Sequence, residues 1–107
     1  MNILITGGAG FLGSRLAGEL LAGAQFDGRP IERLMLADLQ APSGELAGDP
    51  WVASAAGDLA ALIPALFAQQ RWDAVFHLAS AVSAECEADF DLGLHANLDA
   101  TRRLLDA

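Results

Sequence analysis

Three glycines, Gly7, Gly10 and Gly13, recur at every third position directly after a short apolar run at residues 3–5. A residue without a Cβ permits a tight turn at Gly7 and lets a ligand's pyrophosphate approach the backbone at Gly10. Inside the first turn of a helix, Gly13 lets that helix pack closely on the preceding strand. The free N–H groups and positive dipole end of the helix would also attract phosphate. The pattern therefore predicts a dinucleotide-binding turn, and an ordinary tight turn is the alternative.

Asp38 closes the next apolar run, residues 33–38, and bears on which nicotinamide cofactor such a turn would hold. Its carboxylate can accept hydrogen bonds from both hydroxyls of the adenosine ribose and would repel a 2′-phosphate. Leu39 and Gln40 follow it, so the sequence offers no arginine here to offset that repulsion. These residues favour NAD over NADP, unless Asp38 is only a surface acid at a turn. A phosphate-binding P-loop is excluded because its signature needs a lysine, which this chain lacks.

Alternating strands and helices would position these residues. Four strand-like runs are separated by helical or connecting segments, a rhythm typical of βαβ units with right-handed crossovers. The expected strands cover residues 3–5, 33–38, 51–56 and 74–79, and the expected helices cover residues 11–21, 59–70 and 95–107. We predict an α/β fold with a Rossmann-like parallel sheet in the order 3-2-1-4 and flanking helices, half of a doubly wound fold.

Glycine and proline mark the expected breaks between these elements. Gly23 is placed to end the first helix. Pro64 lies inside the second, which either starts near Ile63 or is kinked. Residues 25–32 are expected to form a turn-rich connection, and residues 80–94 a loop with a possible helical turn.

Composition limits the classes of protein to which the chain can belong. With 107 residues, 53% of them hydrophobic, it can bury the core of about one domain, so we expect a single NAD-binding Rossmann domain over residues 1–107. A net charge of -8 argues against binding nucleic acid or an anionic membrane surface. The two histidines lie far apart and Cys86 is the single cysteine, so neither a metal site nor an internal disulfide is expected. No signal peptide or membrane-spanning run is recognised, which predicts a cytoplasmic protein.

Several motifs follow one another along the chain and together carry a family resemblance. They are TGGAGFLG at residues 6–13, Asp38, the pair Gly57-Asp58, HLA at residues 77–79, and Asn97. In these motifs the chain resembles the extended short-chain dehydrogenase/reductase family, which includes NAD-dependent nucleotide-sugar epimerases and dehydratases. The resemblance covers essentially the whole chain and implies the same Rossmann-like fold and NAD as cofactor.

The resemblance also implies roles for individual residues. Asp58 would accept a hydrogen bond from the adenine amino group, with the Leu59 backbone beside it, and residues 78–80 would line the cofactor. Asn97 would tie the last helix to the strand loops. The predicted cofactor-binding residues are Gly7, Gly10, Phe11, Leu12, Gly13, Asp38, Asp58, Leu59, Leu78, Ala79, Ser80 and Asn97.

Two loop segments, residues 26–33 and 87–94, resemble the D-erythronate dehydrogenase subgroup. Members of that subgroup oxidise a hydroxyl of a four-carbon sugar acid with NAD. The resemblance implies hydride transfer to or from a small-molecule sugar acid, and we expect the parent enzyme to be a homo-oligomer. The alternatives are a nucleotide-sugar epimerase or dehydratase, with a nucleotide sugar as substrate, and a non-catalytic dinucleotide-sensing module.

The chain departs from the family in having no tyrosine and no lysine. The family's chemistry uses a Tyr-x-x-x-Lys pair with a Ser or Thr, in which the tyrosine is the general acid/base and the lysine lowers its pKa. No catalytic residue is therefore predicted within the chain. We expect it to be the N-terminal portion of an enzyme, inactive alone, with the catalytic half beyond residue 107. The strand at 74–79 would then be an exposed apolar edge through which the chain self-associates.

Other reactive residue types have simpler interpretations. His77, in an apolar strand, is expected to be packed and hydrogen-bonded, and His95 is expected on a helix surface. Cys86 has acidic neighbours, which disfavour a reactive thiolate. Ser80 and Ser83 are expected to make loop hydrogen bonds, although either could approach a nicotinamide or a substrate.

Overall fold

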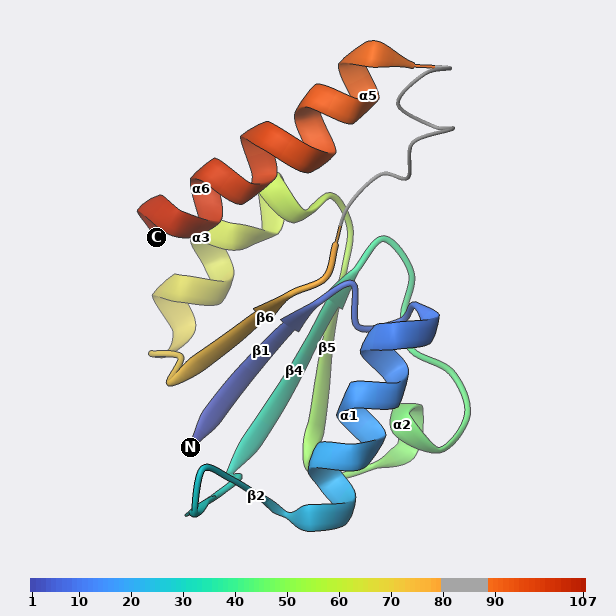
Figure 1. The fold of residues 1–107 in the computed structure, drawn as a ribbon, viewed down its shortest axis with the longest axis vertical. Coiled ribbons are helices and arrows are strands. Elements are labelled where there is room, and N and C mark those ends of the chain that lie inside the picture. The colour runs from blue at the N-terminus through green and yellow to red at the C-terminus, as the bar shows by residue number, and fades with distance from the viewer. Residues whose placement is uncertain (80–88) are drawn as a thin grey trace.

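Four parallel strands form the central sheet, and the computed structural model describes residues 1–79 and 89–107. The strands are β1 (Asn2–Thr6), β4 (Arg33–Asp38), β5 (Val52–Ala56) and β6 (Ala74–His77). Their order across the sheet is β5-β4-β1-β6. Counted along the chain, this is the predicted order 3-2-1-4. The structure therefore confirms a Rossmann-like parallel sheet with flanking helices (Figure 1).

Helices cover both faces of the sheet. They are α1 (Phe11–Gly23), α2 (Glu45–Gly48), α3 (Leu59–Gln69), α5 (Phe90–Leu94), the π-helical segment η1 (His95–Asp99) and α6 (Ala100–Asp106). In Figure 1, α1 lies on one side of the sheet, and α3 and α6 lie on the other. The segments α5, η1 and α6 form one continuous helical run, which begins five residues before the expected start at His95.

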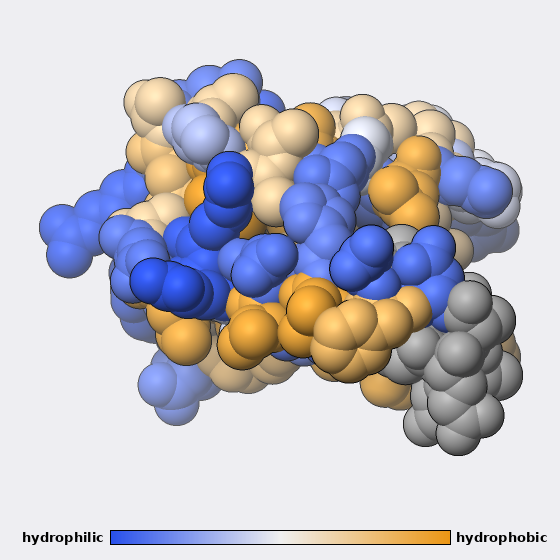
Figure 2. Space-filling view, turned by 90° about the horizontal axis from the view of Figure 1, so that it is seen from above, coloured by the Kyte–Doolittle hydropathy of each residue, from blue (hydrophilic) through white to orange (hydrophobic). Residues whose placement is uncertain are grey.

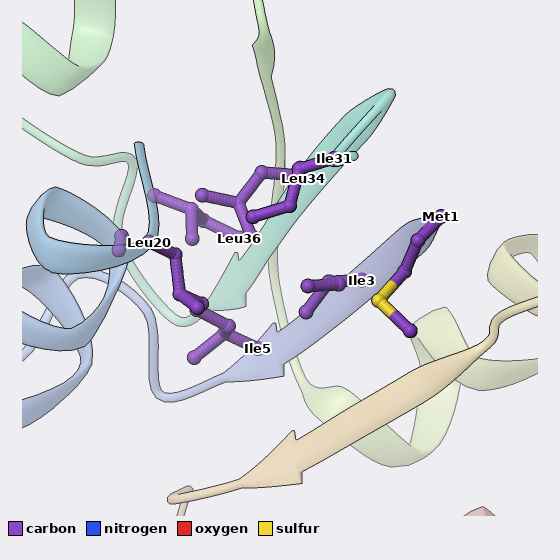
Figure 3. Packing of buried hydrophobic residues seen from close by; sticks show 8 residues of the cluster. Met1, Ile3, Ile5, Leu20, Ile31, Leu34 and Leu36 are labelled. Atoms are coloured by element: carbon purple, nitrogen blue, oxygen red, sulfur yellow. The ribbon is translucent and has the colours of Figure 1, made fainter. Parts of the chain in front are cut away.

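The central strands are buried on both faces, which explains why their sequences are continuous apolar runs rather than alternating ones. On the α1 face, Ile3, Ile5 and Leu34 pack with residues of α1 in one core cluster (Figure 3). On the opposite face, Leu4 and Met35 pack with residues of α3 and α6. Burying each such side chain stabilises the fold by about 1.5–3 kcal/mol relative to exposure. The buried strands β1 and β4 therefore hold the starting points of the loops that follow them in fixed positions.

A β-hairpin occupies the connection that the sequence predicted only as turn-rich. β2 (Gln25–Phe26) pairs antiparallel with β3 (Arg29–Pro30). Asp27 and Gly28 between them both have positive φ, +50° and +74°. An Asp-Gly pair with this geometry is typical of a type I′ hairpin turn, so the signal for the hairpin was present in the sequence.

The end of α1 differs in detail from the expectation. Gly23 is its last residue, but the left-handed position after the helix belongs to Ala24, with φ +53°. The Ala24 N–H donates to the carbonyls of Leu20 and Leu21, and the Ala24 carbonyl accepts the Ile31 N–H at 3.0 Å. Ala24 thus both caps α1 and closes the hairpin, which holds it in a conformation that favours glycine.

The second long helix, α3, begins at Leu59, so a start near Ile63 is wrong. Pro64 lies within it and removes one helical N–H. The side chains of Ala60, Ile63 and Leu66 are buried. Ile63 and Leu66 pack in one cluster with strand residues Leu4 and Met35, on either side of the proline.

The fourth strand, β6, ends at His77 rather than at residue 79. Among the described strands it pairs only with β1, so it lies at the edge of the sheet as expected. Its Val75 side chain is 39% exposed. Self-association through this edge stays a prediction.

Within residues 1–79 and 89–107, no helix is long and apolar enough to cross a bilayer. The same described residues contain no group of three or more His, Cys, Asp or Glu side chains that could hold a metal ion.

Candidate cofactor-binding site

The carboxyl ends of four adjacent strands bring most of the predicted residues to one edge of the sheet. Thr6, at the end of β1, pairs with Ala37 of β4 and His77 of β6, and Asp38 pairs with Ala56 of β5. The glycine loop, Asp38, the Gly57-Asp58 pair and residues 78–79 therefore all leave the sheet on the same side. Ligands of open parallel sheets bind at this edge, where strand order reverses.

The glycine loop packs main chain against main chain. Gly7 has φ +73°, and a Cβ there would lie 2.9 Å from the backbone nitrogen of Ala79. A Cβ at Gly13 would collide with the carbonyl oxygen of Gly7. Glycine is therefore needed at position 13 because the loop that precedes α1 passes so close to it. Gly8, which the spacing argument passed over, is equally constrained, since its Cβ would lie 2.7 Å from the Cβ of Leu36. A side chain at any of these three positions would force neighbouring atoms to shift, so glycine is strongly favoured there.

Gly10 has a different environment. Among the described atoms, only the Gly7 carbonyl oxygen, at 3.4 Å, lies near a Cβ built there, so a side chain would occupy open space in front of the loop. Gly10 is also the N-cap residue of α1, and within the described residues no side chain caps that helix end. Phe11 and Leu12 follow and are 87% and 63% exposed. The start of α1 thus combines open space, available N–H groups and exposed apolar side chains.

Asp38 is fastened to the glycine loop by its side chain. Its Oδ2 accepts the Ala9 N–H at 2.9 Å, and its Oδ1 accepts the Leu39 N–H at 2.6 Å. Its carbonyl accepts the Gly57 N–H at 2.9 Å, which joins the ends of β4 and β5. A carboxylate has about four acceptor positions, so both oxygens can still accept hydrogen bonds from a ligand. Ala9 could not be singled out from the sequence, because its contribution is a backbone N–H.

Asp58 lies between β5 and α3 and pairs with a residue that the sequence did not connect to it. Nε2 of His95 lies 2.9 Å from Oδ1 of Asp58 and 3.0 Å from Oδ2. The Asp58 side chain is 48% exposed, and the His95 side chain is 44% exposed. His95 lies on the surface of a helical segment, as expected, and it also bridges η1 to the start of α3. Leu59, the first residue of α3, is half-buried beside the core.

His77 connects the end of β1 to α6. Its Nδ1 lies 2.7 Å from the Thr6 hydroxyl, and its Nε2 lies 2.8 Å from the Thr101 hydroxyl. The Thr6 oxygen also accepts the N–H groups of Leu78 and Ala79, at 3.1 and 3.2 Å, so its own proton is free to point at His77. This arrangement requires a neutral ring protonated at Nε2. Burial lowers the pKa of His77, in agreement with a neutral ring. The predicted packed, hydrogen-bonded histidine is confirmed.

The roles of two further predicted residues stay predictions. Asn97 is exposed in η1, and its expected role of tying the helix to the strand loops stays a prediction. Ser80 lies outside the described residues, as do Ser83 and Cys86.

The sequence of the chain matches the model of a known protein family. The model of the NAD dependent epimerase/dehydratase family matches residues 3–107. The chain is 50% identical to D-erythronate dehydrogenase of Cupriavidus necator over 113 residues, which cover 99% of this chain and 34% of that protein.

Two solved structures have the same fold. The nucleoside-diphosphate-sugar epimerase from Agrobacterium tumefaciens is 38% identical with a TM-score of 0.87, and the match covers 99% of this chain and 31% of that one. The dTDP-glucose 4,6-dehydratase from Streptomyces venezuelae, a double mutant solved with NAD bound, is 29% identical with a TM-score of 0.80, over 99% of this chain and 35% of that one. The chain therefore spans about a third of the length of each of these proteins.

Proposed function

This chain belongs to the NAD-dependent epimerase/dehydratase family, and we propose that it binds NAD at the carboxyl edge of its sheet. We propose further that residues 1–107 are the NAD-binding Rossmann portion of an enzyme of the short-chain dehydrogenase/reductase type. One contact carries the proposal: the Asp38 carboxylate accepts the Ala9 N–H at 2.9 Å. This hydrogen bond places the acid that would select the ribose directly against the loop that would hold the pyrophosphate.

The described residues fit a dinucleotide. Open space at Gly10 and the uncapped start of α1 suit a pyrophosphate, since backbone N–H groups can bind it without lysine. Asp38 retains acceptor positions for the ribose hydroxyls, and Asp58 for the adenine amino group. The cofactor, when bound, accepts or supplies a hydride at its nicotinamide ring. The remaining predicted contacts are the backbone of Leu59, Leu78 and Ala79, together with Ser80 and Asn97.

For the substrate, we propose a D-erythronate-like sugar acid. The 50% identity to a D-erythronate dehydrogenase over 99% of the chain supports it. A nucleotide-sugar substrate is the second candidate, supported by the likeness to a nucleoside-diphosphate-sugar epimerase. Because the chain has no tyrosine and no lysine, we propose that it is inactive in hydride transfer by itself.

We also propose that the protein self-associates. The β6 edge exposes Val75, and the helical run from α5 to α6 exposes Phe90, Leu98 and Leu105. Figure 2 shows hydrophobic side chains gathered beside a band of hydrophilic ones. Sedimentation should detect oligomers at high concentration, and Val75→Lys should reduce them if the β6 edge is involved. A stable monomer at all concentrations would contradict the proposal.

Calorimetric titration tests the NAD assignment through Asp38. The unaltered chain should bind NAD more tightly than NADP, and Asp38→Asn should weaken NAD about tenfold while removing the repulsion of the 2′-phosphate. Asp27→Asn is the matched control, because asparagine tolerates the left-handed turn conformation of the distant hairpin. Unchanged NAD affinity in Asp38→Asn would refute the assignment.

A further inference from the structure

We infer that His95 is a positioning residue for Asp58 and thereby gives the site its preference for a 6-aminopurine base. The inference rests on the proposed NAD binding and adds a residue to it. It starts from the position of Asp58 at the beginning of α3, a helix of eleven residues. An aspartate at this N-cap position ordinarily accepts a hydrogen bond from an N–H of its own helix.

Asp58 does not make that bond. Its main-chain carbonyl accepts the N–H groups of Ala61 and Leu62, but among the described contacts its carboxylate caps no N–H of α3. The carboxylate instead meets Nε2 of His95, which lies at nearly equal distances from its two oxygens, 2.9 and 3.0 Å. Because both oxygens are acceptors, Nε2 must carry the proton and share it between them. His95 therefore holds the carboxylate in an orientation that its own helix would not select.

The other side of the His95 ring faces Asp99. Nδ1 lies 4.0 Å from Oδ2 of Asp99, one turn further along. His95 is the first residue of the π-helical segment, a local widening that is frequent at functional sites. The ring lies in a groove whose other lining residues are Asp99, Arg102, Arg103 and Asp106. The His95 ring thus comes from η1, a segment that is distant in sequence from Asp58, the residue that the ring orients.

The carboxylate that His95 holds can still bind a ligand. One shared proton leaves acceptor positions on both oxygens, and the Asp58 side chain is 48% exposed. A purine with an exocyclic amino group at position 6 can donate to it, whereas a 6-oxo purine presents an acceptor and is repelled. When the carboxylate is held in place, the donor or acceptor at position 6 decides whether the base binds. When the carboxylate is free to rotate and cap α3, the preference for the 6-amino base should become much smaller.

The test compares NAD with nicotinamide hypoxanthine dinucleotide, which has a 6-oxo group in place of the amino group. The unaltered chain should bind NAD about tenfold more tightly than the analogue, the effect of one hydrogen bond to a charged group. His95→Ala should reduce that ratio to about threefold or less, since a mobile carboxylate makes a weaker hydrogen bond. His95→Gln should recover most of it, because an amide N–H can donate to Asp58.

Arg102→Gln is the matched control, since it lies in the same groove without a described contact to Asp58, and should leave the ratio unchanged. If His95→Ala lowers the helix content, His95→Leu keeps the apolar bulk of the ring and supplies the same comparison. A chain that binds neither dinucleotide contradicts the proposed function itself. A chain that binds NAD, with a base preference absent or unaffected by His95→Ala, overturns only the role of His95.

Discussion

The glycine loop between β1 and α1 and the Asp58–His95 pair on the β5 side of the same sheet edge are built from different kinds of contact. In the loop, Gly7 and Gly13 lie where a Cβ would meet main-chain atoms. The pair joins two half-exposed side chains that come from distant parts of the chain. Where main-chain atoms pack directly against each other, there is no room for an added side chain. We therefore expect substitutions in the loop to affect stability and binding together, and substitutions in the pair to affect mainly binding.

Gly13→Ala tests the loop side of this contrast and should have the largest effect. Its Cβ would collide with the Gly7 carbonyl oxygen, so the free energy of unfolding should fall by about 1–3 kcal/mol, as measured in urea, and NAD binding should weaken with it. Gly18→Ala, in the same helix, is the control. No described neighbour lies within 4 Å of its Cβ, and the change should stabilise α1 by about 0.5–1 kcal/mol. Equal effects of the two variants would contradict the account.

His77 lies between the two extremes, because its contacts are side-chain contacts but are partly buried. His77→Phe should cost about 1–2 kcal/mol of unfolding free energy, since the hydroxyls of Thr6 and Thr101 lose their partner. Denaturant titrations of both proteins at one neutral pH measure this difference. A loss close to zero would mean that the two hydrogen bonds do not contribute to stability.

The same residue predicts a pH dependence. Burial lowers the pKa of His77 in the folded chain, so the unfolded chain binds more protons at mildly acid pH. The contribution of His77 to stability is therefore complete above the unfolded value of about 6.5 and declines as the pH falls toward the lowered folded value. Unfolding free energies measured from pH 8 to pH 5 should show this slope, and His77→Gln should flatten it. An identical slope in both proteins would show that another group titrates.

Asp58→Ala should have the smallest effect on stability. A true N-cap costs about 1 kcal/mol when removed, but the Asp58 carboxylate does not cap α3 and its ion pair is half exposed. Exposed pairs of this kind contribute little, so we expect a change below about 0.5 kcal/mol in thermal or urea unfolding. A loss of 1 kcal/mol or more would mean that Asp58 supports the fold and would remove the contrast with the glycine loop.

The contrast also explains which features could be predicted from the sequence. The strand order and the positions of Gly7 and Asp38 follow from local patterns, because a buried parallel strand and a strand–turn–helix junction each leave a signature within about ten residues. The hairpin at Asp27-Gly28 had a similar local signature that the prediction did not use.

Features that depend on contacts between distant segments left no such signature. The His95–Asp58 pair and the Thr6–His77–Thr101 contacts need the folded positions of η1 and α6, which no spacing rule supplies. The same holds for Gly8, whose glycine is required by Leu36 on another strand. Side-chain contacts between distant segments therefore become visible only in three dimensions.

The central claim is that NAD binds at the loop between β1 and α1, and a nuclear magnetic resonance titration tests it most directly. With the ¹⁵N-labelled chain, NAD should shift the backbone amide signals of Ala9, Gly10, Phe11, Leu12 and Gly13. The amides of the β2–β3 hairpin, which lie away from this edge, should stay in place (Figure 1). Shifts confined to other regions, or none at millimolar NAD, would contradict the account.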